Sequence, residues 1–153
     1  MVARDGRILL SVLLIAGLIG WAGVSQLSSI GIRIVLPFTG GPFLVGIEAT
    51  TNLSFGLGTG SFLLDSAGRT LIAVGVDIDL GEEGSSARTY LRLTTGIYYF
   101  DPSRSFPSPL IGGGISYRLL TFQPLVFGFA SEFIYPLAFP VPMFSASGGW
   151  SFK

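Results

Sequence analysis

Residues 30–48 read IGIRIVLPFTGGPFLVGIE, in which two alternating segments flank a pair of glycines. Ile30, Ile32 and Ile34 fall on one face of an extended strand, because successive side chains in a strand point to opposite sides. The same alternation resumes beyond Gly40-Gly41. Two glycines suit a tight hairpin turn whose central residues both need positive φ. This stretch therefore predicts a β-hairpin with one bulky apolar face.

A turn centred on Gly40-Gly41 also predicts which residues face each other across the hairpin. Ile34 falls opposite Ile47 on the bulky face, and Arg33 falls opposite Glu48 on the other face. Opposite charges at facing positions stabilise a pair of strands. We therefore predict that Arg33 and Glu48 form an ion pair.

Period-two alternation continues to the end of the chain, and no later apolar run approaches the roughly 18 residues of a membrane helix. A glycine-rich part of the third segment, 56–60, breaks the phase, and we expect a β-bulge there because extra residues in strands favour glycine. Turn residues separate the predicted strands, which span 29–38, 43–50, 53–64, 70–80, 88–100, 110–119, 123–135 and 143–152.

Side-chain size indicates which face of these strands lies inside. One face carries Ile, Leu, Val, Phe, Tyr and Trp, and the other carries mostly Gly, Ser, Thr and Ala with a few ions. Bulky side chains from eight strands would overfill a small barrel, whose interior only just accommodates packed side chains. The small face therefore belongs inside, and the bulky face belongs against hydrocarbon. The predicted fold is all-β, an eight-stranded antiparallel up-and-down transmembrane barrel.

The last strand reads Phe144-x-Ala146-x-Gly148-x-Trp150-x-Phe152. With this ending, residues 27–153 resemble the small eight-stranded outer-membrane β-barrels of diderm bacteria. The resemblance implies a location in the cell outer membrane, contact with the lipid bilayer, and a C-terminal signal, Trp150 and Phe152, that the barrel-assembly machinery reads. The chain departs from the family in its final Lys153 and its short predicted outer turns.

Ionic residues of both signs lie on the predicted inner face. Because an unpaired buried charge is costly, a balanced set predicts mutual pairing. Two registers of the fourth hairpin remain open, placing Asp77 opposite either Tyr90 or Arg92. We expect the ions to plug the barrel, with a conducting lining for small solutes as the alternative. The predicted lumen ion-pair network comprises Arg33, Glu48, Asp77, Arg92, Arg118 and Glu132.

Residues 1–25 differ from the rest in having a basic start, an apolar run and small residues near position 25. This order is typical of a secretory signal peptide. We therefore predict a signal helix at 1–25 and a barrel domain at 26–153. The alternative is a retained transmembrane helix that holds a β-rich subunit in a larger complex.

Composition restricts the chemistry of the chain. Nine Lys+Arg balance nine Asp+Glu, which argues against a nucleic-acid partner, and there is no His or Cys. The acidic run Asp77-x-Asp79-x-x-Glu82-Glu83 suggests a cation site, but nearby arginines compete for its oxygens. We predict no catalysis, no cofactor and no metal. The expected role is structural or envelope-stabilising, and the alternative is a narrow pore or carrier for small or apolar molecules.

Overall fold

A computed structural model describes residues 27–37, 43–66, 68–81, 86–99, 108–135 and 138–152 of the chain. The predicted signal peptide at 1–25 lies outside these residues. Within the described part, no helix is long and apolar enough to cross a membrane. The described strands are β1 (Leu27–Pro37), β2 (Leu44–Leu53), β3 (Gly56–Leu64), β4 (Thr70–Asp79), β5 (Ala87–Tyr99), β6 (Ser108–Leu119), β7 (Leu125–Tyr135) and β8 (Ala138–Ser151).

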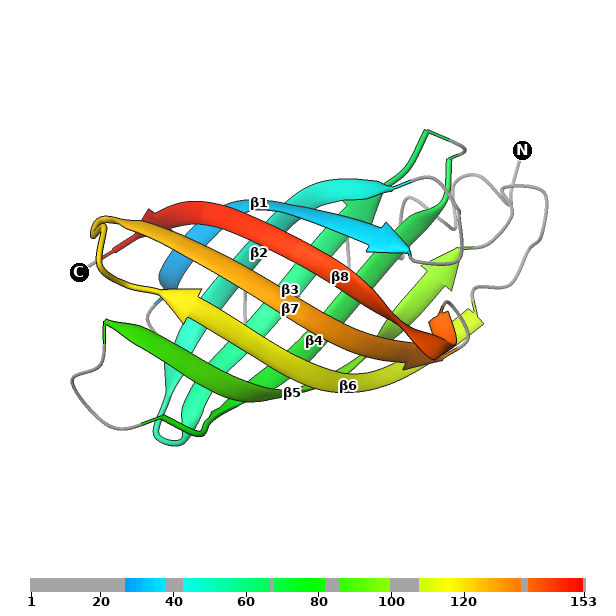
Figure 1. Ribbon diagram of the computed structural model, residues 1–153. Helices are drawn as coiled ribbons and strands as arrows, with labels where there is room; N and C mark the ends of the chain where they lie inside the picture. The colour runs from blue at the N-terminus through cyan, green and yellow to red at the C-terminus, as the bar shows by residue number, and fades with distance from the viewer. Residues whose placement is uncertain are drawn as a thin grey trace.

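Each strand pairs antiparallel with its sequence neighbours, and β1 also pairs with β8, so the sheet closes into a barrel (Figure 1). The start of β1, the end of β8 and the β2–β3 and β6–β7 turns lie at one end of the barrel, on the left in Figure 1. We call it the termini end, after the first residue of β1 and the last residue of β8. The predicted eight-stranded up-and-down topology is confirmed. Closure leaves no edge strand whose backbone groups are unpaired.

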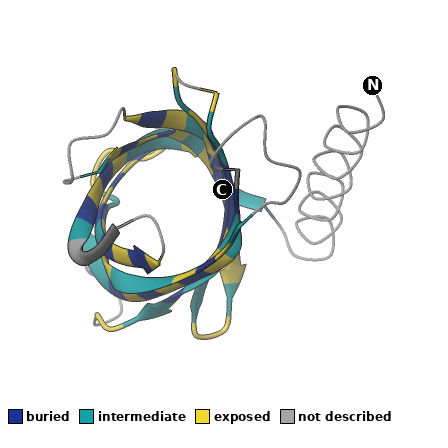
Figure 2. Cartoon of the chain, turned by 90° about the vertical axis from the view of Figure 1, so that its right-hand side faces the viewer, coloured by how far each residue is buried: buried dark blue, intermediate teal, exposed yellow. Residues whose placement is uncertain are grey.

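Bulky apolar side chains point away from the barrel axis, as predicted. Ile32 is 61% exposed, Val74 38% and Phe129 52%, and the exposed positions alternate with buried ones along the strands (Figure 2). A water-soluble barrel would bury these residues in its centre. The outer surface of this barrel is therefore the apolar one.

The register of the first hairpin differs from the prediction by two residues. Arg33 pairs with Gly46, and Glu48 pairs with Gly31, so the two ions are not directly opposite. A slip of two residues keeps every side chain on its own face, because faces alternate with period two. The alternation therefore could not exclude this register, and the assumed turn at Gly40-Gly41 lies outside the described residues.

The predicted bulge in the third strand is wrong. β2 ends at Leu53, which pairs with Gly56 across a turn at Ser54-Phe55, and β3 then pairs without interruption to Leu64. The change of phase arises because the turn splits what looked like one strand. Gly56 has a φ of 152°, a conformation that L residues with a side chain rarely adopt.

One other local prediction agrees with the structure. Of the two registers considered for β4 and β5, the one pairing Asp77 with Arg92 is observed. In the β3–β4 turn, Gly68 has a φ of 79° and donates its N–H to the carbonyl of Asp65 at 3.1 Å. Asp65 also binds the Arg69 guanidinium. Burial lowers the pKa of the Arg69 guanidinium. The hydrogen bond from this guanidinium to the Asp65 carboxylate, together with the charges of Tyr98 and Asp65, outweighs that effect and raises the pKa above its ordinary value.

Two glycines on the inner face allow neighbouring strands to approach closely. A Cβ at Gly46 would lie 1.8 Å from the Phe62 carbonyl oxygen, and one at Gly96 would lie 2.1 Å from the Ile72 carbonyl oxygen. Such contacts with backbone are impossible, so any side chain would push the strands apart. These glycines therefore permit the tight curvature of a small closed sheet.

Candidate functional site

The inside of the barrel is divided along its axis into three regions. Large apolar side chains fill the end opposite the termini, an ionic cluster occupies the middle, and a cavity opens at the termini end. Each region is built from inward-facing residues of several strands. We call them the apolar layer, the ion belt and the cup.

The apolar layer receives at least one residue from every strand. All its members are at most 3% exposed, so they pack against each other across the lumen. Side chains from all eight strands converge there and close this end of the barrel. The apolar layer consists of Val35, Leu44, Leu63, Leu71, Ala73, Tyr98, Leu110, Ile134 and Met143.

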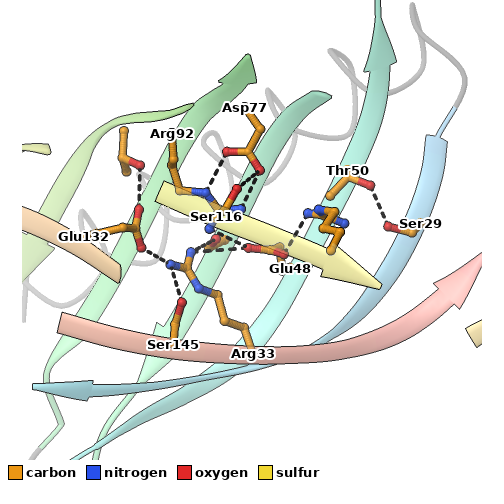
Figure 3. Close-up of polar contacts among 12 residues, drawn as sticks. Ser29, Arg33, Glu48, Thr50, Asp77, Arg92, Ser116, Glu132 and Ser145 are labelled. Atoms are coloured by element: carbon orange, nitrogen blue, oxygen red, sulfur yellow. Dashed lines mark hydrogen bonds and ion pairs between the residues drawn. The ribbon is translucent and has the colours of Figure 1, made fainter. Parts of the chain in front are cut away.

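All six residues of the predicted ion network lie together in the ion belt, where each is at most 5% exposed (Figure 3). Glu48 is its centre. Its Oε2 lies 3.4 Å from Nη1 of Arg33 and 3.5 Å from Nη1 of Arg92, and its Oε1 lies 3.2 Å from Nη2 of Arg118. One carboxylate from β2 thus joins arginines from β1, β5 and β6.

The other two carboxylates of the ion belt bind Arg33 and Arg92 and balance their charges. Glu132 accepts a hydrogen bond from Nη2 of Arg33 at 2.5 Å. Asp77 accepts two parallel bonds from Arg92, from Nε at 2.7 Å and from Nη2 at 2.8 Å. This forked arrangement is the strongest form of a guanidinium–carboxylate pair. Three positive and three negative groups therefore neutralise one another across the lumen.

Hydroxyl groups connect β3 and β8 to the ion belt and add contacts from β5 and β6. Ser61 of β3 and Ser145 of β8 both accept hydrogen bonds from Arg33, at 3.0 and 3.2 Å. Thr94 donates to Glu132, and Ser116 donates to Asp77, each at 3.1 Å. Every strand of the barrel thus contributes at least one side chain, and the belt ties the wall together from inside.

Arg118 is less well compensated than the other two belt arginines. Arg33 and Arg92 each contact two carboxylates, whereas Arg118 contacts Glu48 alone among the described residues. The Nε atoms of both Arg33 and Arg118 are buried without a hydrogen-bond partner among these residues, so the difference lies in the number of carboxylates. Positive charge is therefore concentrated on the side of the belt where Arg118 lies.

The cup is a cavity of about 580 Å³ at the termini end, beyond the ion belt. Its wall combines short polar side chains, such as Ser29 and Thr50, with apolar ones, such as Leu57 and Val126. Ser29 and Thr50 bond to each other through their hydroxyls at 2.6 Å. Its charged lining residues are Asp79, Arg88 and Arg118.

The predicted C-terminal signal lies on the outer surface near the cup. Trp150 is 53% exposed and Phe152 51% exposed. Trp150 pairs with Ile30 and with Leu125, so it belongs to the seam that closes the barrel.

The acidic run considered as a cation site is engaged elsewhere. Asp77 is bound by Arg92, and Asp79 is bound by Arg88 at 2.9 Å. Glu82 and Glu83 lie outside the described residues. Within the part of the chain that is described, no group of three or more acidic side chains is placed to hold a metal ion.

Two features of the lumen were not predicted from the sequence. The alternation places Val35 and Leu44 on the inner face, but it does not indicate that large inward residues gather at one end as an apolar layer. The cup was also missed, because a cavity depends on how far side chains from opposite strands reach. A signal for the layer does exist, since both residues lie at the same end of the first hairpin.

Comparison with known proteins supports the fold. No protein-family model and no curated protein matches the sequence. A solved structure described as "De novo design of transmembrane beta-barrels" has a similar fold, with a TM-score of 0.56. The similarity covers 82% of this chain and 96% of that one at 11% sequence identity, so it concerns the fold alone. The chain is thus a closed, eight-stranded, antiparallel up-and-down barrel that resembles a transmembrane β-barrel.

Proposed function

We propose that this protein is an outer-membrane β-barrel of a diderm bacterium with a structural, envelope-stabilising role. The observation that carries the proposal is the outward exposure of large apolar side chains around a closed sheet, as at Ile32 and Phe129. Such a surface is stable against acyl chains and unfavourable in water. In this role the protein acts through its place in the bilayer and performs no catalysis.

The filled lumen supports a structural role over a conducting one. Among the described residues, the buried side chains of the apolar layer fill its end of the barrel, and the ion belt pairs its charges with one another. A permeating ion would have to displace buried side chains in both regions. The second candidate, a pore for small solutes, lacks such support.

Targeting and assembly follow from the same proposal. Residues 1–25 serve as a cleaved signal peptide, and the barrel-assembly machinery recognises Trp150 and Phe152. Trp150 on β8 and Phe152, one residue beyond the end of that strand at the mouth of the cup, are both exposed, so another protein can reach them. The termini end then faces the periplasm.

The proposal is tested by expressing the full chain in a diderm bacterium and separating its membranes. We expect the protein in the outer-membrane fraction, with its N-terminus after residue 25. It should migrate faster on a gel before heating than after, because a folded barrel resists detergent. A water-soluble product, or one whose mobility does not depend on heating, contradicts the proposal.

The same preparation distinguishes the alternatives. Met1 retained on a protein of the inner membrane would favour the anchored subunit of a larger complex. Single-channel current that changes on Arg92→Gln would favour the pore. A Leu63→Ser variant, altered in the apolar layer, is the matched comparison, because a true pore must pass both regions.

A further inference from the structure

Two neighbouring arginines line the cup, Arg118 at the edge of the ion belt and Arg88 outside it. Arg88 of β5 and Arg118 of β6 are direct cross-strand partners, both facing the lumen, and both line the cup. Like charges at directly opposite positions destabilise a strand pair. A negative charge held between the two guanidinium groups would relieve this repulsion.

Among the described residues, the carboxylates that contact these arginines each bind only one of the two. Asp79 contacts Nη1 of Arg88 at 2.9 Å, and Glu48 contacts Nη2 of Arg118 at 3.2 Å. The Nε atoms of both arginines are buried and lack any hydrogen-bond partner among the described residues. Counting only the residues that the structure describes, Asp79, Arg88 and Arg118 give the lining of the cup a net charge of plus one.

We propose that the cup binds a small organic or inorganic oxyanion, a carboxylate or a phosphate, between Arg88 and Arg118. A planar guanidinium presents several N–H donors, which oxyanions accept in forked pairs. A cavity of about 580 Å³ lies within the range of small-molecule sites. Hydroxyls of the wall, including Ser29 and Thr50, supply further polar contacts, and the apolar wall residues accept a short carbon skeleton.

The anion reaches this site from the termini end, because the apolar layer closes the other. Two sources share the required chemistry, namely a soluble anion and the phosphate of a lipid headgroup at the rim. This site would add ligand binding to the proposed structural role. The binding proposal holds whichever membrane contains the barrel.

The test is a titration of the purified chain in a neutral maltoside detergent, followed by NMR of the arginine Nε–H groups. Inorganic phosphate and acetate are the soluble probes, with ionic strength held constant by chloride. Phosphatidylglycerol added to the micelles is the lipid probe. We expect saturable shifts of the Arg88 and Arg118 signals, with no comparable change at Arg69, which lies in the β3–β4 turn at the opposite end.

Variants locate the effect. Arg88→Gln should weaken binding of the responding probe about tenfold or more, since one charged donor is lost. Arg118→Lys keeps the charge but loses the fork, and should also weaken it. Arg69→Gln is the control and should bind as the parent does. The far-ultraviolet spectrum and heat-dependent gel mobility show whether each variant has folded.

Three results would overturn the proposal. The first is the absence of a saturable shift with all three probes. The second is an equal response at Arg69, which marks an adventitious ion only. The third is unchanged affinity in folded Arg88→Gln. Saturation by soluble phosphate or acetate supports a free anion, and saturation by phosphatidylglycerol alone supports the headgroup.

Discussion

The two ends of the lumen are built from the same strands and the same alternation, yet they have opposite contents. At the end opposite the termini, inward positions hold Leu44, Leu63 and Met143, which are at most 2% exposed. At the termini end, inward positions hold Ser29 and Thr50, whose short side chains leave the cup between them. Side-chain length at equivalent positions therefore determines whether a barrel of this size is plugged or hollow.

The ion belt lies between these two ends and connects the strands that form both of them. Its charges are fully buried, and its residues come from all around the wall. A buried network stabilises a fold only when every member is paired. Variants in the three regions should therefore differ in size of effect in a definite order.

The largest effect is expected when the centre of the ion belt is removed. Glu48→Ala leaves three arginines that shared this carboxylate, and we expect a loss of about 5 kcal/mol in the free energy of unfolding. Glu48→Gln keeps the size of the side chain and isolates the effect of charge. Denaturant unfolding in detergent micelles measures both. A loss below about 1 kcal/mol would mean that the belt does not stabilise the wall.

The next test compares the two ends directly. Leu63→Ala opens a cavity in the apolar layer and should cost about 3 kcal/mol. Ser29→Ala, at an inward position of the cup, should cost less than about 1 kcal/mol, because the Thr50 hydroxyl keeps its hydrogen bond with the Ser28 hydroxyl at 2.8 Å. If both variants lose equal stability, the distinction between a packed end and a hollow end is wrong.

A third test compares the inside of the wall with the outside. Ile32 faces outward next to inward-facing Arg33. Ile32→Arg should destabilise the barrel by about 2 kcal/mol in lipid bilayers, because a charge then faces hydrocarbon. Ile32→Leu is the matched control. Unfolding titrations in vesicles give the difference, and an unchanged stability of Ile32→Arg would contradict a lipid-facing surface.

The smallest change is expected at the rim of the cup. The Arg88–Asp79 pair is partly exposed, so Arg88→Gln should change the free energy of unfolding by about 0.5 kcal/mol at most. The same variant should lose most of its oxyanion binding. Calorimetric or denaturant unfolding beside the NMR titration separates the two effects. A large loss of stability would place Arg88 in the structural network and not in a ligand site.

A large part of this architecture could be predicted from the sequence, but some features were predicted residue by residue and others only in general form. The residues of the ion belt could be assigned because charges on a small-residue face have no other place in a closed barrel. The pairing of Arg33 with Glu48 could be predicted in kind but not in register. Their side chains still meet at 3.4 Å, because a long guanidinium reaches across the two-residue slip.

Other features depended on contacts between residues far apart in sequence. The β2–β3 turn was missed, because glycines at 56–60 suggested a bulge within one strand. Glu132 binds Arg33 although the two residues are 99 positions apart in the sequence. No alternation pattern contains that information.

By itself the sequence determined the class of fold, the number of strands and which residues face outward, because alternation and side-chain size depend only on neighbouring positions. Only the tertiary structure decided the register, the division of the lumen into three regions, and the meeting of Arg88 with Arg118. These depend on how the closed sheet brings eight strands around one axis, and closure sets distances that no single strand carries.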